Sequence, residues 1–307
     1  MVVAVCLAVA GLAWAAWRRY HGYCRLEAFA ERIGRTYQEE GGSFALVAED
    51  GRRMELHAGK KRISIDGTNV CLTYPARRGW LGEGLVSKAD VETLLLPILE
   101  PSLFAAGREI RRIVVDAGHG GSKNDGATYG GFKEKELTLE VARRLEHRLS
   151  EMGFETLMTR TNDEDVSLEA RAEFANSANA DLFVSIHFNA SDKPEYHGFE
   201  TYVANPAGLP SLRGAMGEVA PSNAFDAANA RLGYLVQRRL APISGLEDKG
   251  MGRIQFFVLR NVHCPAVLVE CGYLSHPDDF RIITQPAYWD VMAEGLAAAV
   301  ADFANEK

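Results

Sequence analysis

The chain has 307 residues, a formal net charge of −7, and ordinary fractions of hydrophobic (47%) and charged (24%) residues. These values are typical of a folded protein with one large domain and room for a smaller one, and they exclude a disordered chain. Because the net charge is negative and acids and bases are mixed along the chain, we expect no nucleic-acid partner, which would require a basic face. The five cysteines include no CxxC pair, so we expect separate thiols and no disulfide framework.

The N-terminus is the strongly apolar part of the sequence. An uncharged run over residues 2–17 is followed by Arg18 and Arg19. The run is short for a membrane span, which needs about 20 apolar residues, but it suits a signal peptide, and Ala-Trp-Ala at residues 13–15 has the form of a cleavage site. Tryptophan and arginine at its end also suit an interfacial anchor. We therefore expect residues 1–24 to be a signal peptide or a membrane anchor, which implies export to the periplasm or cell envelope.

Residues 25–105 are predicted to form a small α+β domain. Helical periodicity covers residues 25–37, apolar and polar residues then alternate through three short strands over residues 43–74, and a second helix follows over residues 88–99. No cluster of titratable groups with metal-ligand spacing occurs here. The pattern resembles the stalk-like domain that precedes catalytic domains in some exported bacterial proteins. We expect a spacer or binding module without chemistry of its own.

Residues 110–306 alternate strands with helices. This alternation predicts an α/β domain with a twisted, mostly parallel sheet covered by helices on both faces. The predicted strands are residues 111–118, 154–160, 180–190, 198–203, 254–261 and 265–275, and the predicted helices are residues 134–153, 167–179, 227–243 and 287–306.

Titratable side chains follow the predicted strands of this domain. His119 follows the first strand, His187 ends the strand "LFVSIH", Glu270 ends "AVLVE", and Glu134 begins the first helix. In such sheets, functional groups gather at the carboxyl ends of the strands. Two imidazoles and one carboxylate make a tetrahedral Zn²⁺ site with an open fourth position. A further carboxylate is then needed for proton transfer, and Glu270 suits this role because a charge at the end of so apolar a strand is costly without a partner or a function.

Other residues compete for the same roles. Glu136 follows Glu134 but falls within the first turn of the helix, where an acid commonly serves only as a partner of the helix dipole. Three further histidines are candidate ligands, but none ends a buried strand in so apolar a run: His197, His263 and His276.

Four stretches resemble the zinc-dependent N-acetylmuramoyl-L-alanine amidases of the Amidase_3 type: "VVDAGHGG…GFKEKELTLEVARRL", "TLMTRTND…SIHFNAS", "GFETYV" and "RIQFFVLRN…GYLSHPDDF". The resemblance implies one zinc ion bound by His119, Glu134 and His187, with Glu270 as the catalytic residue. The family's "EK" pattern favours Glu134 over Glu136. It also implies that the protein cuts the amide between N-acetylmuramic acid and L-alanine in peptidoglycan, for cell-wall remodelling or daughter-cell separation.

Two more residues match recurrent positions of this family. For Arg171 we favour an internal ion pair between helix and sheet over a contact with substrate. Asn189 either donates to a substrate carbonyl or caps its loop. Some family members insert an occluding helix that an activator protein moves; residues 204–224 look too short and proline-punctuated for that, although Glu218 within them is a weaker candidate to reach the metal.

The glycines around His119 are expected to form a thin wall without side chains, which admits a long glycan-peptide and lets the backbone turn sharply. Two alternative functions use the same residues. In the first, the protein is another zinc peptidase or deacylase of the cell wall. In the second, it is a non-catalytic peptidoglycan-binding protein with a degenerate site.

Overall fold

A computed structural model describes residues 22–104 and 109–306 of the chain. The predicted signal peptide or membrane anchor, residues 1–24, therefore lies almost entirely outside the described residues. Among the helices of the described part, none combines the length and the apolar character that are needed to cross a membrane.

The C-terminal part of the fold is built on a mixed sheet. Its strands lie in the order β12 (Glu155–Met158), β9 (Arg112–Ala117), β13 (Leu182–Asn189), β16 (Ala266–Tyr273), β14 (Phe199–Ala204) and β15 (Asp248–Ile254). The first four strands are parallel, whereas β14 is antiparallel to β16 and parallel to β15. The predicted α/β class with a largely parallel sheet is confirmed, with a reversal of strand direction at β14.

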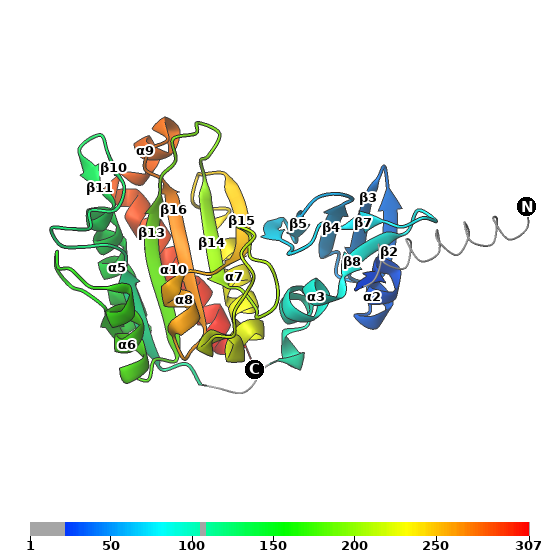
Figure 1. Cartoon of the computed structure of the whole chain (residues 1–307), viewed down its shortest axis with the longest axis horizontal. Helices are drawn as coiled ribbons and strands as arrows, with labels where there is room; N and C mark the ends of the chain where they lie inside the picture. The colour runs from blue at the N-terminus through cyan, green and yellow to red at the C-terminus, as the bar shows by residue number, and fades with distance from the viewer. Residues whose placement is uncertain (1–21, 105–108, 307) are drawn as a thin grey trace, which may run out of the picture.

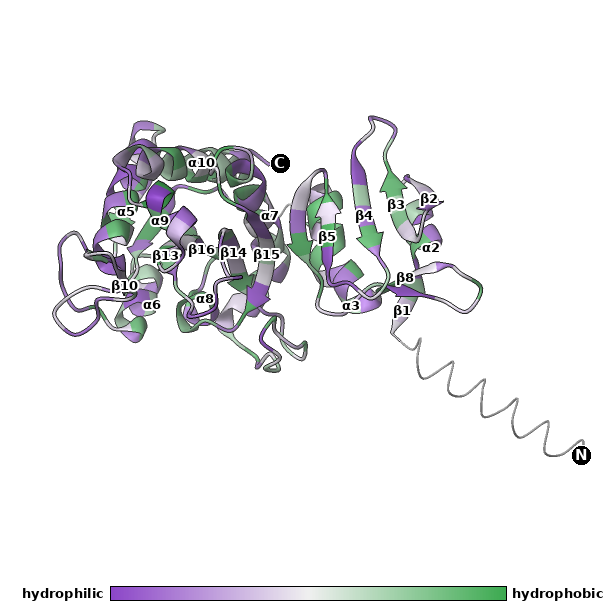
Figure 2. Ribbon diagram, turned by 90° about the horizontal axis from the view of Figure 1, so that it is seen from above, coloured by the Kyte–Doolittle hydropathy of each residue, from purple (hydrophilic) through white to green (hydrophobic). Residues whose placement is uncertain are grey.

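Helices cover both faces of this sheet (Figure 2). One face packs against α5 (Glu134–Glu151), α7 (Asp226–Leu240) and α10 (Pro286–Asn305), and the other against α6 (Leu168–Ser177) and α8 (Phe257–Asn261). Successive residues of a strand point to opposite faces. Accordingly, Ile113 and Val115 of β9 join the apolar cluster of the first face, and Val114 joins that of the second. A strand buried on both faces must be apolar throughout, which explains the continuous hydrophobic runs of the sequence.

The N-terminal part contains more strands than expected. The sequence predicted three strands over residues 43–74, but the structure has four, and β2 replaces the end of the helix predicted over residues 25–37. The helix predicted over residues 88–99 is present as three consecutive segments. The elements are β1 (Tyr23–Arg25), α2 (Leu26–Arg32), β2 (Thr36–Glu40), β3 (Ser43–Val47), β4 (Arg53–His57), β5 (Arg62–Ile65), β6 (Thr68–Cys71), β7 (Arg77–Arg78), β8 (Gly84–Ser87), α3 (Lys88–Asp90), η1 (Val91–Leu95), α4 (Leu96–Leu99) and η2 (Pro101–Leu103).

The two parts share one sheet. Strand β6 pairs with β15 at Val70 and Met251, which produces an 11-stranded sheet that runs from β12 to β2. Figure 1 shows the N-terminal part on the β15 side of the C-terminal sheet. A buried ion pair between Arg253 of β15 and Asp90 of α3 crosses the same junction. The backbone N–H of Asn69 also donates to the Asp248 carboxylate at 3.1 Å. The N-terminal part is therefore joined edge to edge to the sheet of the C-terminal part, which its sequence did not indicate.

One predicted strand is wrong. Residues 254–261, "IQFFVLRN", were expected to form a strand because of their aromatic and β-branched residues. The strand β15 instead lies earlier, at Asp248–Ile254, and Phe257–Asn261 forms α8. The glycines at positions 250 and 252 concealed the true strand, since glycine has low strand propensity. The hairpin of β10 (Thr128–Tyr129) and β11 (Phe132–Lys133), the short helix α9 (Pro277–Ile283) and the 3₁₀ turn η3 (Pro221–Phe225) were not predicted.

Candidate metal centre

Three of the predicted site residues meet at the carboxyl end of the sheet. His119 follows β9, His187 lies in β13, and Glu134 is the first residue of α5. The Glu134 Oε1 atom lies 2.9 Å from His119 Nε2 and 3.1 Å from His187 Nδ1. The two imidazole rings stand edge to face with centroids 4.9 Å apart. Their donor atoms are close enough together to bind a single metal ion.

Hydrogen bonds hold these side chains in place. His119 Nδ1 lies 2.7 Å from Asn124 Oδ1, which leaves Nε2 facing Glu134. The Glu134 carboxylate accepts from the backbone N–H groups of Ala127 at 2.8 Å and Phe188 at 3.0 Å. Such partners orient a ligand and contribute to metal affinity. Sequence reasoning missed Asn124, because a loop asparagine five residues from a histidine carries no signal without the fold.

The charges of the group are mutually stabilised. Burial acts to raise the pKa of the Glu134 carboxyl, but the hydrogen bonds and charges of His119 and His187 lower it well below its usual range. Burial likewise acts to lower the pKa of His119, and the hydrogen bond and charge of Glu134 raise it. Glu134 is therefore the anion of the centre. Glu136, its competitor in sequence, is exposed in the first turn of α5.

The glycines around His119 turn the backbone, as expected, with positive φ at Gly120 and Gly121, and they also make room for the neighbouring side chains, which was not expected. A Cβ atom at Gly118 would lie 2.4 Å from Cε1 of His187, and one at Gly126 would lie 2.5 Å from Oε2 of Glu134. Side chains at these positions would occupy the space of the ligands themselves. The glycines thus admit the ligand side chains, and His119 itself adopts a left-handed conformation, with φ at 58°, to turn toward them.

A buried ion pair supports the first ligand. Arg171 Nη1 lies 2.6 Å from Asp116 Oδ1, and Arg171 Nη2 donates to the His119 carbonyl at 2.6 Å. Arg171 thus lies in the internal ion pair that was expected of it. Arg160 was not predicted, although it is almost fully buried and donates to the carbonyls of Ala117 and Gly118. An arginine at the end of an apolar strand, "TLMTR", was the available signal.

Glu270 faces the same space from the neighbouring strand. It pairs in register with His187 across the parallel strands β16 and β13. Its side chain is only 8% exposed, and no donor in the described part of the chain reaches its Oε2 atom. Burial, together with the charges of Glu134 and Glu200, raises its pKa well above the usual value. A buried carboxyl group without a donor is suited to exchange protons.

One cavity of about 410 Å³ is lined by His119, Glu134, His187 and Glu270. Its walls are mostly apolar and include Leu168, Phe188, Phe256, Phe257, Val258 and Leu268. Asn189 also lines the cavity, and its side-chain oxygen accepts from the Ala190 N–H at 2.9 Å, so it caps its own loop. The amide nitrogen of Asn189 takes no part in that cap.

The competing candidates lie outside this cavity. Glu218 pairs with Arg260 at 2.8 Å. His197 and His276 stack on each other with centroids 4.7 Å apart and, with Asp279, form a second group of metal-ligand type. This second group has no residue in the cavity that holds His119, Glu134, His187 and Glu270.

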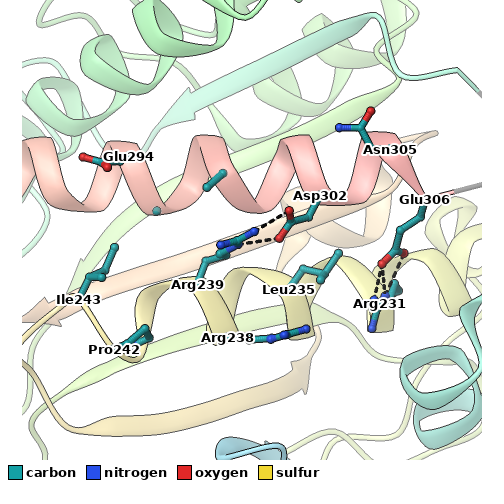
Figure 3. Close-up of a pocket in the computed structure, with 12 residues that line it drawn as sticks. Arg231, Leu235, Arg238, Arg239, Pro242, Ile243, Glu294, Asp302, Asn305 and Glu306 are labelled. Atoms are coloured by element: carbon teal, nitrogen blue, oxygen red, sulfur yellow. Dashed lines mark hydrogen bonds and ion pairs between the residues drawn. The ribbon is translucent and has the colours of Figure 1, made fainter. Parts of the chain in front are cut away.

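A larger cavity of about 710 Å³ lies between α7 and α10 and shares no residue with the site (Figure 3). Two ion pairs lie along it. Arg239 Nε lies 2.6 Å from Asp302 Oδ2, and Arg231 pairs with Glu306 near the C-terminus. Arg231 also donates to the Ile98 carbonyl at 2.9 Å, so α7 contacts α4 at this end of the cavity.

The fold and the site define an α/β protein whose crevice brings two histidines and a glutamate together beside a buried glutamate. Residues 113–302 match the Amidase_3 family, described as N-acetylmuramoyl-L-alanine amidase. The chain belongs to this family.

Relatives and solved structures agree with the assignment. The chain is 34% identical over 185 residues to the N-acetylmuramoyl-L-alanine amidase LytC of Bacillus subtilis, which covers 60% of this chain and 34% of LytC. It is 29% identical over 226 residues to the amidase AmiC of Neisseria meningitidis, covering 65% of this chain and 54% of AmiC. The crystal structure of an N-acetylmuramoyl-L-alanine amidase from Clostridium difficile 630 matches with a TM-score of 0.56 and 30% identity, covering 65% of this chain and 100% of that one. The chain thus spans about a third of LytC and about half of AmiC.

Proposed function

We propose that the protein is a zinc-dependent N-acetylmuramoyl-L-alanine amidase that hydrolyses the amide between N-acetylmuramic acid and L-alanine in peptidoglycan. The observation that carries the proposal is the convergence of His119, Glu134 and His187 within one group, with the buried Glu270 in the same cavity. Family membership supports the choice of bond. The site would act in the cell envelope, where this substrate lies.

The donor set fits Zn²⁺. Two imidazole nitrogens and one carboxylate oxygen form the three-ligand arrangement of catalytic zinc sites, which leaves a position open for substrate. The Asn124 contact to His119 and the backbone N–H groups that hold Glu134 provide the surrounding hydrogen bonds that such ligands need. When bound, the ion would polarise the scissile carbonyl and lower the pKa of water toward about 7.

Glu270 moves the proton of the reaction. Its carboxylate accepts a proton from the attacking water and returns it to the departing amine of L-alanine. The raised pKa of Glu270 favours the second half of this transfer, because the carboxyl group can hold a proton until the amine leaves. The apolar walls at Phe188 and Leu268 exclude competing water and strengthen the electrostatics of the site.

Asn189 is proposed to contact the substrate. Its side chain lines the cavity, and its oxygen is already engaged by Ala190, so its amide nitrogen can donate to a substrate carbonyl. Arg171 is proposed to position His119 through the backbone and not to touch the substrate, because it is buried in the ion pair with Asp116.

Substitutions at the site test the proposal. Glu270→Ala is expected to retain zinc and lose turnover, whereas His119→Ala is expected to lose both. Glu218→Ala is the matched control, because this carboxylate pairs with Arg260 outside the cavity, and it should retain both properties. Zinc content is measured by elemental analysis after dialysis.

Products are identified by mass spectrometry of purified peptidoglycan digests with and without chelator. Free stem peptides that begin with L-alanine support the amidase. Cut cross-links or deacylated sugars would instead indicate another zinc peptidase or deacylase, and intact peptidoglycan would indicate a binding protein. Full zinc occupancy in His119→Ala would refute the ligand assignment.

A further inference from the structure

The loop of residues 205–220, between β14 and η3, is a self-bonded hairpin that carries Arg213 at its turn. The Gly208 N–H donates to the Gly217 carbonyl at 2.8 Å, and the Ser211 N–H donates to the Ala215 carbonyl at 2.8 Å. These bonds close the hairpin on both sides of Arg213. The loop therefore presents this side chain from a defined backbone.

The hairpin is also fixed to the sheet. The Leu212 N–H donates to the carbonyl of Arg253 in β15 at 2.8 Å. The side chain of Gln255 donates to the carbonyl of Met216. Because both anchors lie at the carboxyl end of β15, the turn that carries Arg213 is held beside the cavity wall formed by the residues that follow this strand.

Arg213 is a free cation at the rim of that cavity. Its guanidinium carbon lies 5.4 Å from the ring centroid of Phe256, which lines the cavity. It forms no ion pair with any carboxylate in the described part of the chain, whereas the neighbouring Arg253 pairs with Asp90 and Arg260 pairs with Glu218. The aromatic face holds the guanidinium without neutralising it.

We propose that Arg213 is a specificity-determining residue that binds a free carboxylate on the peptide part of the substrate. The inference rests on the proposed amidase function. In the intact substrate the lactyl carboxyl is consumed in the amide, and the sugar carries only hydroxyl and acetamido groups. A carboxylate within reach of the scissile bond therefore comes from the peptide, on the residue that follows L-alanine. Guanidinium and carboxylate form strong charge-assisted hydrogen bonds.

Two muramoyl tripeptides test the proposal. They share the lactyl–L-alanine amide and differ only in whether the α-carboxylate of the second residue, D-glutamate, is free or amidated. For the wild-type enzyme we expect kcat/KM to be about tenfold higher for the free acid than for the amide, because KM is lower for the free acid. A tenfold difference corresponds to the contribution of about one hydrogen bond to a charged group. In Arg213→Ala this preference should fall to about one, and in Arg213→Glu the amide should be preferred, because a like charge repels the carboxylate.

Arg260→Ala is the matched control, since Arg260 is an arginine near the same loop whose charge is already paired, and it should retain the wild-type preference. Arg213→Lys should retain part of the preference. A wild-type enzyme that does not distinguish the two substrates, or an Arg213→Ala variant that still does, would refute the role of Arg213 while leaving the amidase function intact. A zinc-loaded wild type that cleaves neither substrate would refute the proposed function and this inference with it.

Discussion

Replacing Arg171 by methionine removes the cation from a buried ion pair and leaves the Asp116 carboxylate without its ion-pair partner. Both side chains are almost completely buried, at 3% and 1% exposed. Methionine fills similar space, so the change removes charge and hydrogen bonds more than volume. The carboxylate keeps its bonds from Thr159 at 2.6 Å and Ser185 at 2.7 Å. These two hydroxyl groups supply no positive charge.

We expect the free energy of unfolding to fall by about 3–5 kcal/mol, the usual cost of breaking a buried pair by removing one partner. This is a large part of the roughly 5–15 kcal/mol that stabilises a typical protein. Arg171 also donates to the His119 carbonyl. We therefore expect zinc affinity to fall by about 10–100-fold, as is common when a partner of a metal ligand is lost.

Urea denaturation of the zinc-free protein measures the first effect, and competition with a chelator measures the second. Arg239→Met is the control, because its ion pair with Asp302 is about half exposed, and such a pair contributes about 1 kcal/mol or less. Asp116→Asn combined with Arg171→Met should recover part of the loss, since no unpaired charge remains. A loss below about 1 kcal/mol in Arg171→Met would refute the account of the buried pair.

The same variant should show a characteristic pH dependence. Burial acts to raise the pKa of Asp116, but Arg171, Thr159 and Ser185 lower it below its usual value of 3.8. The pair therefore contributes stability that is fully present above this value and is lost as the pH falls through the lower pKa of the folded state. In Arg171→Met, burial dominates and the pKa of Asp116 rises. The difference between wild type and variant should shrink on acidification, as Asp116 takes up a proton.

Two further predictions concern glycine and the junction of the two parts. Gly118→Ala should displace His187, because its Cβ would lie 2.4 Å from the ring; we expect weaker zinc binding by chelator competition and near-normal folding, and unchanged zinc affinity would contradict this packing. Asp90→Asn should weaken the buried contact with Arg253 and lower the urea midpoint by an amount equivalent to about 3 kcal/mol. If the wild type unfolds in one transition and the variant unfolds in two, this pair couples the two parts of the protein. Identical unfolding curves would exclude that coupling.

Much of the catalytic part was predictable from local pattern. Strands buried on both faces must be apolar throughout, so "IVV" and "LFVSI" predicted β9 and β13. The polar residues that follow these runs indicated the edge of the sheet where the site residues meet. Histidine and glutamate at those positions indicated metal chemistry because their donor types are those of zinc sites. The structure brings His119, Glu134 and His187 together, and it places Glu270 in the same cavity.

Other features depended on contacts between residues that are far apart in the sequence. Strand β15 was missed because it owes its place to pairing with β14 and β6, while its glycines have low strand propensity. Three residues could be assigned a role only from their contacts in the folded chain: Asn124, Arg160 and Arg213.

The amino-acid sequence by itself determined which residues we propose for metal binding and proton transfer, since donor type and position at a strand end are local properties. Only the tertiary structure decided what supports them. Ion pairing, steric room at Gly118 and the joining of β6 to β15 depend on distances between segments up to about 180 residues apart. Those distances are set by packing of the whole sheet, which no local pattern records.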